Sequence, residues 1–217
     1  MIRAIVFDFD GVLADSEPLH LRAYQEVLAK RGVTLSREEY YSAYLGYDDA
    51  GVFSALGRVH DWRLDPSGLA ALIAEKGEVF DRIVETSDVL YRGAAECIAG
   101  LAGEYPLGIA SGALRPEIEA VLRRAGLEHH FKFIVASGDT PNSKPAPDPY
   151  VRAAELHGMP APECLAIEDS RWGIESARSA GLPCIGITNT YPRHELATAD
   201  RVIDSLAEFT PAFIRSL

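Results

Sequence analysis

The sequence predicts an α/β fold: a Rossmann-like parallel-sheet core in three αβα layers, with an all-helical domain inserted after the first strand. Two observations support this prediction. From about Tyr91 onward, short apolar runs alternate with helical segments, which is the pattern of βαβ units. Before that point, one strand-like run is followed only by helical periodicity, up to about Arg82. The second part has no first strand of its own, so we expect a core domain of residues 1–14 and 86–217 and an insertion of residues 15–85.

The opening run, residues 2–9, is β-branched and aromatic without strict alternation, which is typical of a strand covered on both faces. The pattern predicts further strands at residues 107–110, 133–136, 165–167, 184–187 and 202–203. It predicts core helices at residues 94–102, 116–125, 149–157 and 173–180, and inserted helices at 18–32, 36–44, 49–56 and 66–84. Asp148 before Pro149 is typical of an N-cap followed by the first helical residue.

Composition excludes several classes of protein. The chain has 217 residues, with 21 basic and 32 acidic side chains, so its formal charge is −11. An acidic protein repels polyphosphate backbones, so we expect no nucleic-acid partner. No run approaches the roughly 18 apolar residues of a transmembrane helix, and the N-terminal apolar run is too short for a signal peptide. We therefore expect a cytoplasmic protein with no membrane partner, as a monomer or weak homodimer.

The cysteines are interpreted as structural. Cys97, Cys164 and Cys184 form no C-x-x-C motif, and three cysteines cannot all pair within one chain. We expect them to be buried thiols in a reducing compartment.

Candidate functional residues gather at four predicted strand ends, where open parallel sheets bind their ligands. They are Asp8 and Asp10 with Gly11, Ser111 with Gly112, Lys144, and Glu168 with Asp169. Each has an ordinary alternative: solvated acids at a turn, a hydroxyl that caps a turn, a surface lysine and an N-capping aspartate. Because all four fall at one predicted edge of the sheet, a common site is favoured over four unrelated turns.

The chemistry of this group suits a metal and a phosphate. Oxygens from Asp8, Asp10 and Asp169 match the preference of Mg²⁺, and a cation relieves the repulsion between close carboxylates. Lys144 lies on a loop stiffened by Pro145 and Pro147, so it is a preorganised cation for a phosphate oxygen. The sequence therefore predicts a small phosphorylated partner in spite of the negative net charge.

These residues, with their order and spacing, resemble the four motifs of the haloacid-dehalogenase superfamily of phosphotransferases. The matching segments are DFDGVLADSEPLH, ASG, SKPAPDPY and IEDSRWGIESA. The helical insertion after the first segment is similar to the cap of the β-phosphoglucomutase-like and phosphoglycolate-phosphatase-like branch. The resemblance covers almost the entire chain.

The resemblance implies a role for each matched residue. Asp8 would be the nucleophile that forms an aspartyl phosphate, and Asp10 the general acid and then base, with a backbone carbonyl that binds Mg²⁺. Asp169 would be a metal ligand, and Glu168 either a ligand or a residue beside one. The phosphoryl oxygens would be held by Ser111, the backbone at Gly112 and Lys144.

The resemblance leaves the reaction open between a phosphatase and a mutase. A protein of another class, a signalling module, is a third alternative. A phosphatase is favoured over a mutase, because LGYDDAGVF has acids where mutases carry an arginine for a second phosphate. A receiver-type phospho-aspartate signalling module is opposed by the helical insertion and by the pair of acids after the first strand. Substrate contacts are expected in the cap from Ser16, His20 and Tyr47, although a packed helix histidine is the favoured interpretation of His20.

Overall fold

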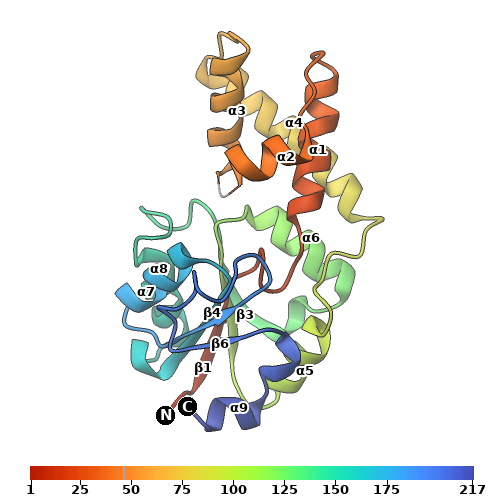
Figure 1. Cartoon of the computed structure of the whole chain (residues 1–217). Coiled ribbons are helices and arrows are strands. Elements are labelled where there is room, and N and C mark those ends of the chain that lie inside the picture. Colours follow the sequence, from red (N-terminus) through yellow and green to blue (C-terminus); the bar gives the residue numbers. More distant parts are fainter. Residues whose placement is uncertain (46) are drawn as a thin grey trace. The chain divides into compact units, whose positions relative to one another are not determined.

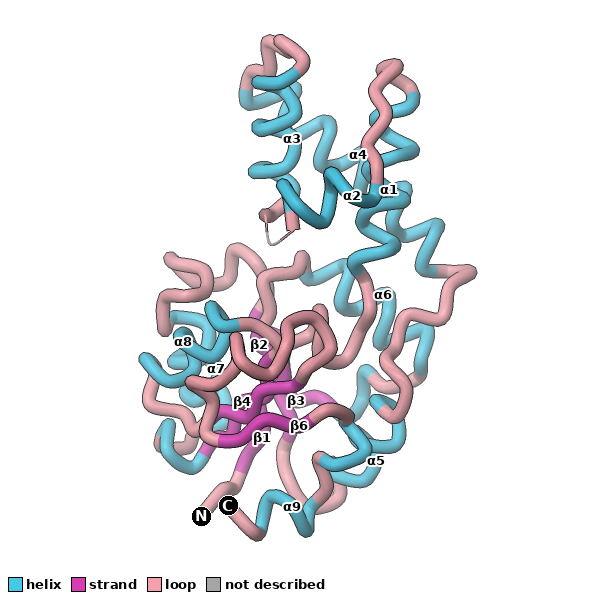
Figure 2. Tube along the Cα trace, in the orientation of Figure 1, coloured by secondary structure: helices cyan, strands magenta, loops and turns pink. Residues whose placement is uncertain are grey.

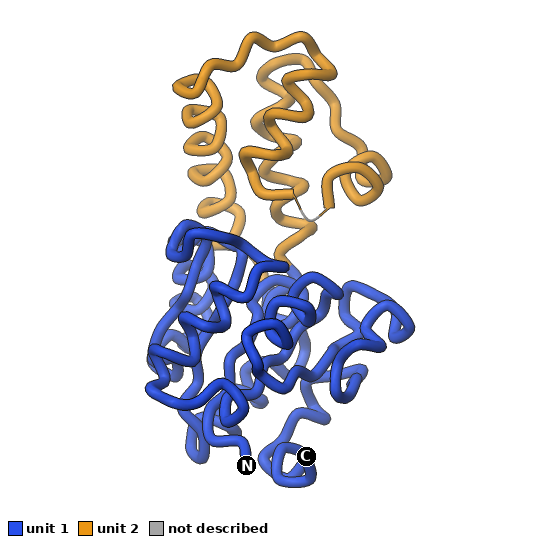
Figure 3. The backbone as a smooth tube through the Cα atoms, turned by 90° about the vertical axis from the view of Figure 1, so that its left-hand side faces the viewer, with its two compact units in different colours: residues 1–15, 89–217 blue, residues 16–88 orange. Residues whose placement is uncertain are grey.

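The computed structural model describes residues 1–45 and 47–217 and divides into two compact units (Figure 3). The core unit comprises residues 1–15 and 89–217, and the helical unit comprises residues 16–88. Both divisions lie slightly C-terminal to the expected ones. Backbone hydrogen bonds explain this, because the Asp15 N–H donates to the Val89 carbonyl at 2.8 Å and the Tyr91 N–H donates to the Leu13 carbonyl at 2.9 Å.

The core unit is built on a six-stranded sheet with the order β3-β2-β1-β4-β5-β6 (Figures 1 and 2). Every neighbouring pair is parallel. The strands are β1 (Ala4–Phe7), β2 (Leu107–Ala110), β3 (Phe131–Val135), β4 (Cys164–Glu168), β5 (Cys184–Ile187) and β6 (Arg201–Ile203). The chain reverses its direction of sheet growth at β1, which lies between β2 and β4. This topology confirms the predicted fold class and marks the carboxyl ends of β1 and β4 as the place for a ligand.

Helices cover both faces of the sheet (Figure 1). One layer contains α7 (Asp148–His157) and α8 (Arg171–Ser179), and the other contains α5 (Ala94–Ala102), α6 (Arg115–Ala125) and α9 (Pro211–Arg215). Residues of β1 pack on both sides, because Ala4 and Val6 join the core beneath α7 and α8, whereas the Phe7 ring meets Phe209 at 6.0 Å. Short 3₁₀ turns span Glu128–His130, Ala161–Glu163 and Leu206–Glu208.

Several predicted boundaries need correction. β1 is shorter than predicted, because after Asp8 the chain turns and the N–H groups of Leu13 and Ala14 both donate to the Phe9 carbonyl. Asp148 is not an N-cap. It is the first residue of α7, and Pro147 precedes it in the cap position. The side chain of Asp148 instead accepts a hydrogen bond from the Asn142 amide at 2.9 Å.

The helical unit contains α1 (Glu17–Ala29), α2 (Arg37–Glu39), a π-helix (Tyr40–Tyr44), α3 (Asp49–Val59) and α4 (Pro66–Val84). The helix predicted at residues 36–44 is therefore two short pieces. Tyr40 is fixed by tertiary contacts, since its hydroxyl donates to Glu17 at 2.7 Å and its ring lies 5.7 Å from that of Tyr24. Among the described helices of both units, none is long and apolar enough to cross a membrane.

Candidate active site

Three buried carboxylates lie together at the carboxyl edge of the sheet. Asp8 follows β1, Glu168 ends β4, and Asp169 comes next in the chain. Each offers an oxygen, and these oxygens all lie within 4.8 Å of one another. Asp8 is 8% exposed, Asp169 is 6% exposed and Glu168 is fully buried, so they are not the solvated acids of an ordinary turn. The parallel pairing of β1 with β4 brings them together, because the Asp8 N–H donates to the Ile167 carbonyl at 3.0 Å.

Lys144 provides a cation to this cluster. Its ammonium donates to Glu168 Oε1 at 2.5 Å and lies 2.9 Å from Asp8 Oδ1. The side chain is 13% exposed, so the alternative of a solvated surface lysine is wrong. The cluster has three carboxyl groups and one ammonium, so its ionised form has an excess of negative charge that a divalent cation would neutralise.

The electrostatics reflect that excess. Burial raises the pKa of Glu168, and the neighbouring Asp8 adds to the shift. Burial also raises the pKa of Asp169 well above its ordinary value, with further contributions from Asp8 and Glu168. Burial alone would lower the pKa of Lys144, but the charges of Asp8 and Glu168 outweigh it and raise that pKa. Lys144 therefore stays charged, whereas the raised pKa values of Glu168 and Asp169 make these two carboxyl groups harder to ionise.

Two glycines permit the close approach of backbone to this cluster. Gly11 has φ +76°, and a Cβ atom there would overlap the Asp169 carboxylate. A Cβ atom on Gly173, in the first turn of α8, would overlap the Glu168 carboxylate. The helix is capped by Ser170, whose hydroxyl accepts from the Gly173 N–H at 3.1 Å, so the alternative that Asp169 is the N-cap is wrong.

Asp10 and the Ser111–Gly112 turn lie at the same edge. Asp10 is partly exposed in the turn after β1, where it forms a bridge with Ala14. Ser111 is buried at the end of β2, the neighbour of β1, and its hydroxyl accepts from the Ala113 N–H at 3.1 Å. Gly112 is exposed, and a Cβ atom there would meet open space. Ser111 thus does cap its turn, and its role toward phosphate stays a prediction, as does that of Gly112.

The structure adds three residues that the sequence did not single out. Tyr150, on α7, donates its hydroxyl to Glu168 Oε1 at 2.7 Å. Thr190 donates to the Asp169 carboxylate, and the Asn189 amide donates to the Gly11 carbonyl at 2.8 Å. Asn189 and Thr190 follow β5, which ends at the same edge as β1 and β4. The strand-end rule applied to this fifth strand would have found them.

The expected cap residues lie in the helical unit. Ser16 is buried at the start of α1, and Tyr47 is 56% exposed with its ring 6.5 Å from that of Tyr44.

The His20 ring stacks on the Phe80 ring with their centres 4.4 Å apart, and its Nδ1 lies 2.7 Å from Lys76 Nζ. Burial, together with the Lys76 charge, lowers the pKa of His20 well below its ordinary value. A neutral His20 therefore accepts from the Lys76 ammonium through Nδ1, and a substrate role for these residues stays a prediction.

The acidic stretch where mutases carry an arginine is described except for Gly46, which lies outside the described residues. Asp48 caps α3 by accepting from the Gly51 N–H at 2.7 Å. Asp49 pairs with the fully buried Lys76 at 3.0 Å and accepts from the Tyr24 hydroxyl at 2.5 Å. The positive charge of Lys76 is thus matched by Asp49.

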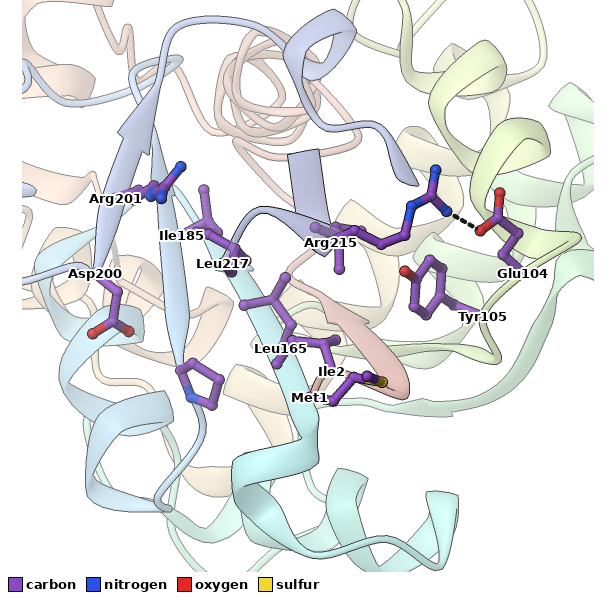
Figure 4. Close-up of a pocket in the computed structure, with 12 residues that line it drawn as sticks. Met1, Ile2, Glu104, Tyr105, Leu165, Ile185, Asp200, Arg201, Arg215 and Leu217 are labelled. Atoms are coloured by element: carbon purple, nitrogen blue, oxygen red, sulfur yellow. Dashed lines mark hydrogen bonds and ion pairs between the residues drawn. The ribbon is translucent and has the colours of Figure 1, made fainter. Parts of the chain in front are cut away.

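A cavity of about 900 Å³ lies at the opposite, amino edge of the sheet (Figure 4). It is lined by residues from the starts of β4, β5 and β6 and from both ends of the chain. Two of its charged residues have ion-pair partners, since Arg215 pairs with Glu104 and Asp200 pairs with Arg178. None of the predicted site residues lines it, so the carboxyl edge remains the candidate active site.

Comparison with known proteins decides the family. Residues 2–181 match the model of the haloacid dehalogenase-like hydrolases. The chain belongs to this hydrolase family. It is 36% identical over 217 residues to protein CbbY of Cereibacter sphaeroides, covering 96% of this chain and 94% of that protein. It is 33% identical over 223 residues to the phosphoglycolate phosphatase of Yersinia pestis, covering 97% and 93%.

A solved structure agrees with this assignment. A CbbY mutant from Rhodobacter sphaeroides, in complex with xylulose-(1,5)bisphosphate, has a TM-score of 0.85 and 34% identity, with 96% of both chains covered. The family predicted from the four motifs is therefore confirmed. As a haloacid dehalogenase-like hydrolase, the chain is an enzyme, and the buried acidic cluster lies in its core unit.

Proposed function

We propose that this hydrolase is a Mg²⁺-dependent phosphatase that removes phosphate from a small metabolite of the sugar phosphate or phosphoglycolate type. The observation that carries the proposal is the convergence of three buried carboxylates and Lys144 at the switch point of the sheet. Similarity to a phosphoglycolate phosphatase and to a CbbY mutant in complex with xylulose-(1,5)bisphosphate supports the substrate class.

The donor set fits Mg²⁺. The cluster offers only carboxylate oxygens, which are the ligands that hard divalent cations prefer. The raised pKa values of Glu168 and Asp169 indicate that the cluster lacks positive charge, which a second cation would supply. Asp8 and Asp169 would hold the ion, with Glu168 beside them and the Asp10 carbonyl as a further ligand. When bound, Mg²⁺ supplies positive charge that offsets the repulsion between a carboxylate nucleophile and a phosphate dianion.

In the proposed reaction, Asp8 attacks the phosphorus through a carboxylate oxygen and forms an aspartyl phosphate. Its Oδ1 accepts from the Phe9 N–H at 2.7 Å, which fixes the side chain, and the attack is assigned to Oδ2. Lys144, already 2.9 Å from Asp8 Oδ1, is placed to hold a transferring phosphoryl oxygen, with Ser111 on the neighbouring strand. The covalent intermediate divides one difficult displacement into two easier ones.

Asp10 acts as the proton donor and acceptor. It protonates the leaving alkoxide in the first step and takes a proton from the attacking water in the second. Asp10 follows Asp8 by two residues and lies in a turn, where it is partly exposed. It is not one of the three clustered buried carboxylates. A second acid of this kind favours phosphate esters over carbon–halogen bonds, whose halide leaving group needs no proton.

A phosphatase is favoured over a mutase by the helical unit. A mutase must also hold a second phosphate, and Asp48 and Asp49 stand where that cation is expected. Lys76, the buried cation of this region, is neutralised by Asp49. Membership of a hydrolase family opposes a non-catalytic signalling module.

The test is a substrate panel of phosphorylated sugars, phosphoglycolate and nucleotides, scored for released phosphate and for isomerised product with Mg²⁺ present. We expect phosphate release from one or more small phosphate esters, together with an acid-stable phosphoryl adduct on the Asp8 peptide after rapid quenching. An isomerised product without net phosphate release would identify a mutase. A long-lived adduct without turnover would identify a signalling module.

A further inference from the structure

Tyr150 contacts both members of the Lys144–Glu168 pair. Its hydroxyl donates to Glu168 Oε1 at 2.7 Å, and Lys144 Nζ lies 5.0 Å from the centre of its ring. Lys144 donates to the same Oε1 oxygen at 2.5 Å. We propose that Tyr150 is a positioning residue that holds Glu168 and thereby keeps the Lys144 ammonium shared between Glu168 and Asp8. The proposal rests on the proposed function only in taking a phosphoryl group as the ligand of Lys144.

The argument begins with the hydrogen-bonding capacity of Glu168. Its side chain is fully buried, so each carboxylate oxygen depends on protein donors. Oε1 has two short donors, Lys144 and Tyr150. Among residues 1–45 and 47–217, Oε2 has only a long contact of 3.5 Å with the Ser170 hydroxyl. The Tyr150 hydroxyl is therefore the short uncharged hydrogen-bond donor to the Glu168 carboxylate, beside the charged donor Lys144.

Removing the Tyr150 hydroxyl would change how strongly Glu168 competes with Asp8 for the Lys144 ammonium. Glu168 Oε1 would keep one short donor, and a buried carboxylate with fewer donors attracts the remaining cation more strongly. The ammonium would then move toward Glu168 and away from Asp8, to which it now lies at 2.9 Å. Since Asp8 marks the side on which a phosphoryl group would be transferred, Lys144 would lose part of its hold on that group.

The ring of Tyr150 has a separate role. It belongs to the hydrophobic cluster beneath α7 and α8 that also contains Val6 and Ile174. The ring face also attracts the Lys144 ammonium. Tyr150→Phe keeps both ring contributions and removes one oxygen, so it isolates the hydroxyl. Tyr105→Phe, at the amino edge of the sheet, is the matched control.

The experiment measures inorganic phosphate binding to the Mg²⁺-loaded protein by calorimetry, alongside KM and kcat for hydrolysis. For Tyr150→Phe we expect phosphate to bind about tenfold more weakly and KM to rise by a similar factor, with a smaller change in kcat. In a Glu168→Gln background, Tyr150→Phe should weaken phosphate binding little further, because the hydroxyl acts through the carboxylate. Tyr105→Phe should match the wild type in every measurement.

Two results would overturn the positioning role: unchanged phosphate affinity in Tyr150→Phe, or an equal loss in the wild-type and Glu168→Gln backgrounds. The binding measurement needs no turnover, so it separates this inference from the proposed function. Phosphate binding with the expected loss in Tyr150→Phe, but no hydrolysis of any ester, would reject only the phosphatase. A wild-type protein that binds no phosphate would reject both.

Discussion

Two lysines, one in each unit, have similar surroundings and a different charge balance: the Lys76 side chain is fully buried, and that of Lys144 is 13% exposed. Lys144 in the core unit lies against Asp8, Glu168 and the ring of Tyr150. Lys76 in the helical unit lies against Asp49 and His20 and over the Phe80 ring. Both ammonium groups are thus held by carboxylates and aromatic faces.

The number of carboxylates distinguishes the two sites. Lys76 pairs with the carboxylate of Asp49 and lies beside a neutral histidine, so an acid matches its charge. Lys144 faces two acids directly, with Asp169 beside them, so its group keeps a negative excess. We interpret a lysine whose charge is matched by one carboxylate as a structural element. A buried group with more carboxylates than cations is instead arranged to bind a further cation.

The largest expected effect comes from removing the nucleophile of the unbalanced group. Asp8→Asn should lower turnover by about a thousandfold or more, since the amide cannot form the covalent intermediate. The fold should be retained, because the amide oxygen can still accept from the Phe9 N–H. Steady-state phosphate release checks the loss and circular dichroism checks the fold. Wild-type rates in this variant would remove Asp8 from the mechanism.

Substituting Lys76 and Lys144 in turn tests whether the two groups differ in their charge balance. Lys76→Met leaves Asp49 without its buried partner, so we expect a loss of about 3–5 kcal/mol in unfolding free energy that Mg²⁺ does not repair. Lys144→Met also destabilises the protein, but its three carboxylates can take Mg²⁺ instead, which should restore most of the thermal midpoint. Denaturation with and without Mg²⁺ distinguishes them. If Mg²⁺ raised the thermal midpoint of both variants equally, the two groups would not differ in their capacity to bind a cation.

Asp10→Asn probes the acid step with a smaller effect. Loss of a general acid slows expulsion of an alkoxide by about a hundredfold or more, whereas an activated aryl phosphate leaves without a proton. We expect a large loss of kcat/KM with alkyl phosphates and a small one with aryl phosphates. Equal losses with both substrate types would argue against proton donation by Asp10.

The stability of the metal-free protein should fall as pH rises. Burial, with the charge of Asp8 second, raises the pKa of Glu168 to about 7, so the folded state keeps a proton that the unfolded chain loses near pH 4.3. Between these values the folded state binds more protons, and unfolding free energy therefore decreases with increasing pH. Thermal midpoints in EDTA from pH 4.5 to about 7.5 measure this slope, and Mg²⁺ should reduce it. A rise of the midpoint across this range would contradict the charge excess.

Much of the fold follows from local patterns. β2, β5, α4 and α5 have the predicted bounds, because their apolar runs and their Pro and Gly boundaries agree with their tertiary environments. The π-helix at Tyr40–Tyr44 was not predicted, since it depends on contacts of Tyr40 with Glu17 and Tyr24, which are distant in sequence. The cysteines are free and buried, as the absence of any pairing motif predicted.

The sequence predicts those residues of the candidate site that come at the ends of strands. Asp8, Glu168 and Asp169 could be placed together because parallel strands bring their carboxyl ends to one edge. Tyr150 could not, because it occupies an apolar position of α7 and its sequence environment is that of an ordinary core residue. Only the packing of α7 beneath the loop of Lys144 reveals that its hydroxyl reaches Glu168.

The most direct test of the charge excess is Mg²⁺ titration of the metal-free protein by calorimetry, with Asp169→Asn and Asp49→Asn as a matched pair. The account predicts one ion bound per wild-type chain, an affinity about 10- to 100-fold weaker in Asp169→Asn, and an unchanged affinity in Asp49→Asn. No binding by the wild type, or the same affinity in Asp169→Asn, would contradict the account.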